Sequence, residues 1–152
     1  MILKVIRRTH RKIKAPAKRK AVVKVGFPAG ESDSETVQKA VWNEFGTRGG
    51  ASGGGWGGPI PERPFMRNSV QNNRGKYKSN LKAAARSILD GTQSVEGVLR
   101  SLGDDAKGDI QKEIKSLMSP PNSPVTVALK GSSKPLVDTG EMMGAVTYKV
   151  ET

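Results

Sequence analysis

Residues 134–146, with the sequence KPLVDTGEMMGAV, have the spacing with the clearest chemical meaning in this chain. Two apolar residues precede Asp138, Thr139 and Gly140 there. If the protein formed a dimer, the Asp138 carboxylates of its two halves could share a proton and activate a water molecule for hydrolysis. The rest of the chain would have to supply the supporting parts.

Aspartic proteases begin their catalytic loop with Asp-Thr-Gly, but they also need a strand-rich body, a hairpin flap and a later apolar segment that supports the loop. Only fourteen residues follow Asp138, and the middle of the chain has helical periodicity. We therefore interpret the motif as a turn. The side chain of Asp138 or Thr139 accepts backbone N–H groups at the start of a short helix.

Other catalytic arrangements lack essential residues. His10 is the only histidine and the chain has no cysteine, so a Ser-His-Asp triad, a multi-histidine metal site and thiolate chemistry are all excluded within one chain. Asp104, Asp105 and Asp109 do not follow the order of a calcium loop. The glycine-rich run lacks the Gly-Lys-Ser/Thr of a phosphate loop. We expect a binding or structural protein, not an enzyme, with no cofactor and no metal.

Positive charge is concentrated at the N-terminus. Residues 1–24 hold ten of the 26 lysines and arginines and no acid, whereas the remainder has 16 basic and 14 acidic residues. We predict a basic arm over 1–20 and a single domain over 21–152. The arm lacks aromatic residues for base stacking, so we expect it to contact DNA without sequence specificity or to contact an acidic protein. The candidate contacts are Arg7, Arg8, Arg11, Lys12, Lys14, Lys18, Arg19 and Lys20.

The sequence predicts a small α+β domain. Val23, Val25 and Phe27 alternate as in a strand with one buried face. Ser32, Asp33 or Ser34 could cap a helix over 35–45, although an edge strand is the alternative there. The apolar face of that helix would be Val37, Ala40, Val41 and Phe45.

A glycine-rich loop follows over 46–60. Eight of the thirteen residues from Gly46 to Gly58 are glycine, so the segment has few side chains with which to order itself. We expect a flexible loop that orders against a neighbouring subunit, with Trp56 as a contact candidate.

Helices are predicted for most of the remaining chain. One runs over 64–89, with Pro64 as its first residue and Gly75 as a weak point; its apolar face is Tyr77, Leu81, Ala84, Ala85, Ile88 and Leu89. Two shorter helices follow, over 95–102 and 106–118, the second capped by Asp104. The prolines of 119–124 end the helical region, and a short apolar element and a loop follow. A helical turn after Gly140 and a strand over 146–150 complete a small antiparallel sheet packed with several helices.

Three separated elements carry a resemblance to a known family. They are NEFGT at 43–47, IPERPF at 60–65 and KPLVDTG at 134–140. Together, and in this order, they resemble the neck and tail-completion proteins that join head to tail in long-tailed bacteriophages and prophages. The long glycine-rich insertion between the first two elements departs from the pattern of that family.

The resemblance implies a virion structural protein located at the neck and assembled in the host cytoplasm. It implies a homo-oligomeric ring of six or twelve copies that contacts connector or head-closure proteins on one side and tail terminator or tube proteins on the other. DNA in the channel is a further implied contact, whereas a membrane is not. The alternative is a sequence-independent nucleic-acid-binding protein that acts through its basic arm.

Six residues are candidates for assembly contacts or for shaping the fold: Phe45, Gly46, Trp56, Arg63, Phe65 and Asp138. We expect Phe45 and Phe65 to anchor the core on either side of the loop. Gly46 suits a left-handed turn that leaves the preceding helix. Arg63 lies between two prolines, so its stiff backbone favours pairing with a carboxylate, and Glu44 is one candidate partner.

Overall fold

The computed structural model describes residues 21–28, 30–48, 59–137 and 139–151. The basic arm, Trp56 and Asp138 therefore lie outside the described residues. The elements are β1 (Val22–Gly26), α1 (Ser34–Phe45), α2 (Phe65–Leu89), α3 (Val95–Ser116), α4 (Pro124–Lys130), α5 (Glu141–Gly144) and β2 (Thr147–Glu151). The prediction of a small α+β fold is confirmed.

The two strands come from opposite ends of the described chain and pair antiparallel. Val23 lies opposite Val150 and Val25 opposite Tyr148. Because successive side chains of a strand point to opposite faces, these four residues share one face of the sheet. The opposite face carries Val22 and otherwise mainly polar residues, and there Lys24 Nζ donates to Glu151 Oε1 at 2.8 Å.

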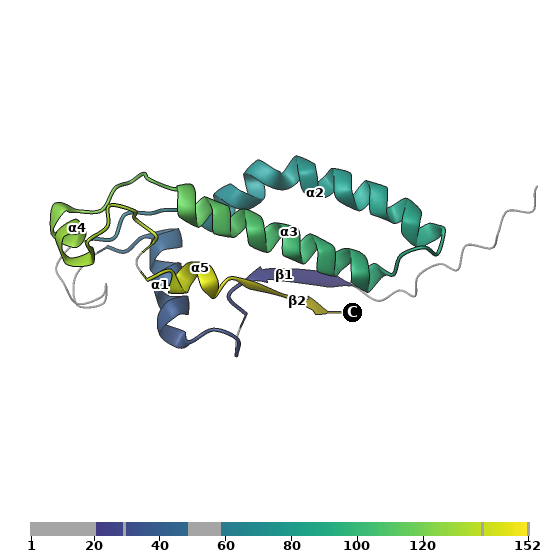
Figure 1. Ribbon diagram of the computed structural model, residues 1–152, viewed down its shortest axis with the longest axis horizontal. Coiled ribbons are helices and arrows are strands. Elements are labelled where there is room, and N and C mark those ends of the chain that lie inside the picture. Colours follow the sequence, from purple (N-terminus) through teal and green to yellow (C-terminus); the bar gives the residue numbers. More distant parts are fainter. Residues whose placement is uncertain (1–20, 29, 49–58, 138, 152) are drawn as a thin grey trace, which may run out of the picture.

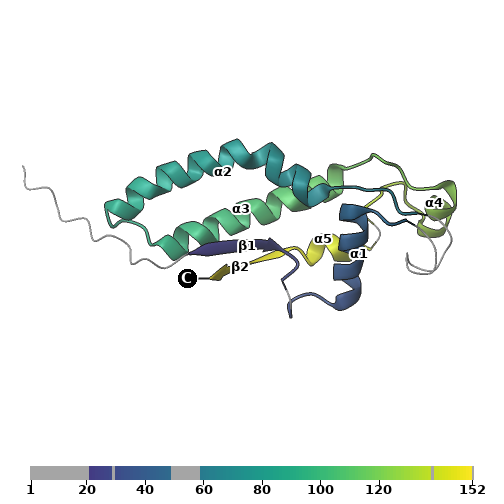
Figure 2. The same cartoon turned by 180° about the vertical axis from the view of Figure 1, so that it is seen from behind.

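The molecule has three layers. Figure 1 shows α2 and α3 running antiparallel as a long hairpin, with β1 and β2 on the side of α3 that faces away from α2. The reverse view keeps the same order (Figure 2). The sheet and α2 both pack on α3, so α3 is the central element of the fold.

The core lies where α1, the C-terminal half of α3 and α5 meet. Phe65, Ile110, Ile114 and Val146 are at most 1% exposed. The ring of Phe27 packs edge-on against that of Phe65, with centroids 6.4 Å apart. Four more buried side chains extend this cluster: Ala40, Leu117, Leu136 and Met142.

The prediction of two helices over 95–118 is wrong, because α3 runs unbroken from Val95 to Ser116. Gly103 lies in its middle under the ring of Tyr148, where an added Cβ would come within 2.4 Å of the ring. This glycine makes room for the sheet and does not end a helix. Asp104 consequently lies inside α3, and Ser94 is the cap, accepting from Gly97 N at 3.0 Å.

Of the three candidate caps of α1, Asp33 is the one used, and of the four residues of the predicted buried face only Ala40 is buried. Asp33 Oδ1 accepts from Thr36 N at 2.8 Å. The buried residues of α1 are Thr36, Ala40 and Glu44, whereas Phe45 is 64% exposed. The helix is thus turned so that a carboxylate faces inward, and only Phe65 of the two expected anchors lies in the core.

Three smaller predictions, on Pro64, on Gly75 and on the prolines of 119–124, are also wrong. Pro64 is the N-cap of α2, which begins at Phe65 and continues through Gly75 without a break. The helical region does not end at the prolines, because Pro124 is the first residue of α4. This short helix is capped by Ser123, whose Oγ accepts from Thr126 N at 3.1 Å.

Candidate functional site at a three-element junction

The elements 43–47, 60–65 and 134–140 meet at one end of the molecule, close to α1 and α4 (Figure 1). We call this region the three-element junction. Its first two elements are joined through their backbones. Thr47 N donates to Ile60 O at 2.9 Å, and Arg63 N donates to Asn43 O at 2.7 Å. Ile60 N also donates to Thr47 Oγ1 at 3.0 Å, so the two segments that flank the glycine-rich run are held together.

Gly46 is required by the close approach of these two elements. Its φ is +69°, a region that other residues rarely adopt. A Cβ built there would lie 2.9 Å from Ile60 O and 3.0 Å from Glu62 N. The expected positive φ is thus present, although a ψ of 175° extends the chain instead of forming a left-handed helical turn, and the absence of a side chain is also needed for packing.

Arg63 is buried, with 4% of its surface exposed, and it ties the second element to the segment between α3 and α4. Its Nε donates to Pro120 O at 2.8 Å, and its Nη2 donates to Pro121 O at 3.1 Å. The same guanidinium donates to two amide oxygens, Asn43 Oδ1 at 3.1 Å and Asn122 Oδ1 at 3.2 Å. Burial lowers the pKa of Arg63. The expected pairing with Glu44 is wrong, because neutral oxygens satisfy this cation.

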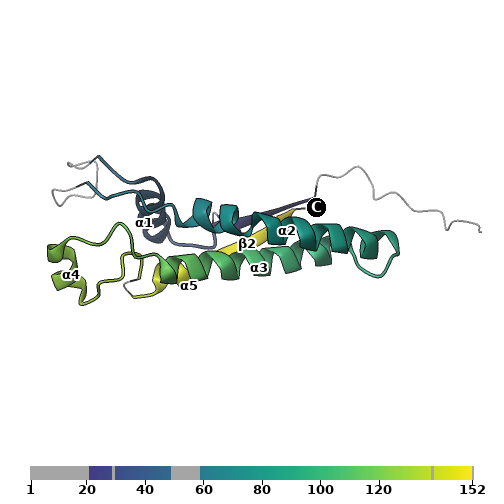
Figure 3. The same cartoon turned by 90° about the horizontal axis from the view of Figure 1, so that it is seen from above.

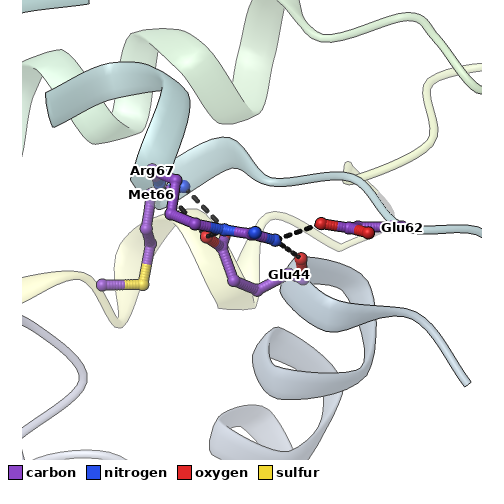
Figure 4. A network of polar contacts seen from close by, with 4 residues as sticks. All are labelled: Glu44, Glu62, Met66 and Arg67. Atoms are coloured by element: carbon purple, nitrogen blue, oxygen red, sulfur yellow. Dashed lines mark hydrogen bonds and ion pairs between the residues drawn. The ribbon is translucent and has the colours of Figure 1, made fainter. Parts of the chain in front are cut away.

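Glu44 instead caps α2 from the neighbouring helix (Figure 4). Pro64, the N-cap residue, supplies no side-chain acceptor for the free N–H groups of the first turn. The Glu44 carboxylate accepts from Met66 N at 2.9 Å and from Arg67 N at 3.1 Å. A negative charge at a helix N-terminus is further favoured by the helix dipole.

Arg67 completes this polar cluster. Its Nε donates to Glu44 Oε1 at 3.0 Å, its Nη2 donates to Glu44 O at 2.7 Å, and it also pairs with Glu62. These contacts raise the pKa of Arg67, the hydrogen bond with Glu44 contributing most. The guanidinium lies 5.2 Å from the centroid of the Phe45 ring, so Phe45 packs on a cation at the surface.

The third element closes the junction. Pro135 and Leu136 are buried, and Lys130 Nζ donates to Pro135 O at 3.5 Å. Asn122 Nδ2 donates to Lys134 O at 3.4 Å, so the segment that receives Arg63 also contacts this element. Between it and α1 lies a pocket of about 220 Å³, lined by residues that include Thr36, Asn43, Lys130, Leu136 and Met142.

Thr139 and Gly140 form the entry to α5. Thr139 Oγ1 accepts from Glu141 N at 3.4 Å, as expected for a turn. Gly140 has a φ of +86° and is the residue before the helix. The expected role of Asp138 lies outside the described residues, as do those of Trp56 and of the eight candidate contacts of the arm.

The junction offers ion pairs and hydrogen bonds. Within the described ranges, no group of three or more His, Cys, Asp or Glu side chains could hold a metal ion. Among those same residues, no helix is long and apolar enough to cross a membrane.

Large apolar side chains at the end of the molecule that holds the three-element junction are exposed, with Phe45 at 64%, Val125 at 70% and Leu129 at 84%. We call these three residues the apolar end.

Two parts of the junction had no clear signal in the sequence. Arg67 was not identified, although its place three residues after Pro64 puts it in the first turn of α2. The carbonyl groups of Pro120 and Pro121 are backbone acceptors, which no residue type marks in advance.

Comparisons with protein-family models, with curated proteins and with solved structures found no match to this chain. The fold and the junction define a small α+β protein with a tightly bonded junction beside exposed apolar side chains.

Proposed function

We propose that this chain is a structural virion protein of a tailed bacteriophage, which forms a ring at the head–tail junction and joins connector proteins to the tail. The observation that carries the proposal is the convergence of the three elements. Backbone hydrogen bonds join residues 43–47 to 60–65, and residues of 43–47 and 134–140 line one pocket. Arg63 and the backbone of Lys134 also both contact Asn122, which links the second element to the third. The pattern behind the resemblance thus corresponds to one spatial unit.

The surroundings of the junction suit a subunit contact. Exposed apolar side chains that are grouped on the surface of a protein mark sites where another protein binds. Phe45 and Leu129 lie on α1 and α4, at the end of the molecule where the junction lies (Figure 3). Glu44 bonds α1 to the first turn of α2, and Arg63 bonds the second element to the segment that precedes α4. Contacts of this kind pre-organise a surface, and a pre-organised surface loses little entropy when it binds.

Electron microscopy of particles made without the protein tests the role at the neck. We expect filled heads and separate tails, because the joining subunit is missing. Joined and infectious virions would contradict the proposal.

A pair of surface variants tests the contact itself. We expect Phe45→Ser combined with Leu129→Ser to fold normally, as judged by circular dichroism, but to fail in ring formation measured by native mass spectrometry. Leu89→Ser is the matched control, because Leu89 is 52% exposed and lies at the end of α2, at the other end of the molecule (Figure 1). Equal ring formation by both variants would rule out the apolar end as the contact.

A second candidate function rests on the ten cations and absent acids of residues 1–24. In it the chain binds nucleic acid through the basic arm, without reading sequence. Deleting residues 1–20 should then weaken DNA binding and reduce its salt dependence, measured at two salt concentrations. Unchanged affinity would remove this candidate.

A further inference from the structure

The helix α2 carries six cations and no acid over its 25 residues. Two of the cations are engaged within the fold. Arg67 pairs with Glu44 and Glu62, and Lys76 Nζ lies 2.9 Å from Asp109 Oδ2. The other four are Arg74, Lys78, Lys82 and Arg86, which we call the cation ridge.

The cation ridge lies along one face of α2. Its members occur at every fourth position, and a helix has 3.6 residues per turn, so their side chains form a single slowly winding row. The rise between neighbours is about 6 Å and the whole row is about 18 Å long. All four residues are exposed.

This face points away from the rest of the molecule. The opposite face of α2 meets α3, where Tyr77 Oη donates to Asp109 Oδ2 at 3.0 Å and Asn80 Nδ2 donates to Asp105 Oδ2 at 3.1 Å. The sheet lies beyond α3, so α2 forms an outer layer (Figure 1). Nothing in the described part of the chain forms an ion pair with the ridge.

The ridge is unfavourable for an isolated helix. Like charges four residues apart lie next to each other on a helix surface and repel. The ridge contains three such pairs in succession and no glutamate that would offset them. A linear polyanion laid along the helix would remove this repulsion.

We propose that the cation ridge binds the phosphate backbone of a double-helical nucleic acid, without reading its sequence. Duplex DNA has one phosphate per about 3.4 Å of axis on each strand, so two steps are about 6.8 Å and close to the spacing of the ridge. The ridge contains no aromatic residue, and base stacking on single strands depends on aromatic side chains.

A second copy of this chain is a poorer partner. The best-placed carboxylates of the described residues are already engaged, Glu44 and Asp109 in buried clusters and Glu96 with Arg100. Six acids have no ion pair within the described residues and are scattered along the chain, with Asp104 and Glu113 nine residues apart on α3: Glu31, Asp33, Asp90, Asp104, Glu113 and Glu141. Charge complementarity therefore favours a phosphate backbone.

The inference does not rest on the role at the neck. The cation ridge is on α2 and is distinct from the basic arm, so each can be changed alone. Ring formation and joining of heads to tails test the proposed function, whereas nucleic-acid binding tests the ridge, and either can fail without the other.

The experiment measures binding of the full chain to a labelled DNA duplex of mixed sequence by fluorescence anisotropy at several salt concentrations. The ridge variant combines Arg74→Gln, Lys78→Gln, Lys82→Gln and Arg86→Gln, which keeps good helix formers at all four positions. The control variant removes the same charge from exposed positions elsewhere, through Arg48→Gln, Lys115→Gln, Lys134→Gln and Lys149→Gln.

We expect the ridge variant to lower the slope of log affinity against log salt by about 3 to 4, since each phosphate contact contributes about 0.9. The control variant should keep most of the original slope. Lys78→Arg combined with Lys82→Arg should retain the full slope, because the charge is kept. An RNA duplex should show the same loss, since the contact is to phosphate and not to base or sugar.

Three results would overturn the inference. The ridge and control variants could change the slope equally, which would indicate a general effect of net charge. The ridge variant could keep its slope but lose self-association in sedimentation, which would make the ridge a contact between copies. It could also keep its slope while losing affinity for poly-glutamate, which would indicate an acidic protein partner.

Discussion

Glu44 shows how a single residue can hold two elements together. Its carboxylate is 95% buried, lies at the end of α1 and accepts the N–H groups of Met66 and Arg67 in the first turn of α2. A buried charge is tolerated only where donors surround it. The site of α2 initiation is thereby fixed by a residue of another helix.

We predict that Glu44→Gln lowers the free energy of unfolding by about 1.5 to 3 kcal/mol, because hydrogen bonds to a charged group are lost or weakened. Glu62→Gln is the matched control, since Glu62 pairs with the same Arg67 but is about half exposed. The control should change stability by less than about 1 kcal/mol. Urea unfolding followed by circular dichroism measures both, and equal effects would contradict the cap.

Tyr77 provides a test of the α2–α3 interface. Burial, followed by its hydrogen bond to Asp109, raises the pKa of Tyr77 from 10.0 to about 12. The chain has two tyrosines, so in a Tyr148→Phe variant the phenolate absorbance reports Tyr77 alone. We expect its midpoint near pH 12, and a midpoint near pH 10 would contradict the buried contact.

The raised pKa of Tyr77 determines how the free energy of unfolding changes with pH. Below pH 10 the phenol is protonated in both the folded and the unfolded chain, so its contribution to stability is fully present. Between about pH 10 and 12 the unfolded chain loses the proton and the folded chain keeps it. The free energy of unfolding should therefore fall over this interval, and fall less steeply in Tyr77→Phe, as measured by urea unfolding.

At the scale of elements, the contact between α3 and the sheet depends on the absence of a side chain. Gly103 lies under Tyr148, whose ring atoms would approach an added Cβ to 2.4–2.8 Å. Gly108 lies in the same helix, and a Cβ there would meet nothing within 4 Å. One glycine is thus needed for packing, whereas the other has no such role.

We predict opposite effects of alanine at these two positions. Gly103→Ala should lower the free energy of unfolding by about 1 to 3 kcal/mol, because the ring must move from its place on the helix. Gly108→Ala should raise it by about 0.5 to 1 kcal/mol, because alanine is the better helix former. Thermal and urea unfolding of both variants provide the measurement. A gain in stability from Gly103→Ala would mean that the sheet does not pack on α3 at this point.

At the scale of the whole molecule, α3 is the element covered on two sides. Its buried residues include Ala106, Ile110 and Ile114, whereas α2 buries only Phe65 and Ser69, near its start. Regions with few buried contacts open at a lower free energy than the core. The second half of α2 should therefore be the less stable part of the helical hairpin.

Hydrogen exchange measures this difference. We expect the amides of residues 106–114 to exchange only through global unfolding, and those of 78–89 to exchange faster through local opening. Equal protection of the two segments from exchange would contradict an arrangement in which α2 is an outer layer and α3 the central one. Added duplex DNA should slow exchange in 78–89 if the cation ridge binds it.

Local features of this fold could be predicted from the sequence because they depend on residues a few positions apart. The alternation of Val23 and Val25 predicted β1, and the capping residues Ser32, Asp33 and Ser34 predicted where α1 starts, with Asp33 the one that caps it. The positive φ of Gly46 was likewise expected. Each of these follows from the steric limits or hydrogen-bonding groups of the residue itself.

Other features were decided only by tertiary contacts. Apolar periodicity predicted that Phe45 is buried, yet Phe45 is exposed and Glu44 is buried, because the Glu44 carboxylate accepts the free N–H groups of α2. The sequence predicted two helices over 95–118, yet α3 is continuous and its Gly103 lies under the ring of Tyr148. The sequence by itself thus determined where most helices and strands form, through local sterics and capping. The tertiary structure decided which faces are buried and which elements meet, because a buried charge or a missing side chain is stabilised by groups that are distant in the chain.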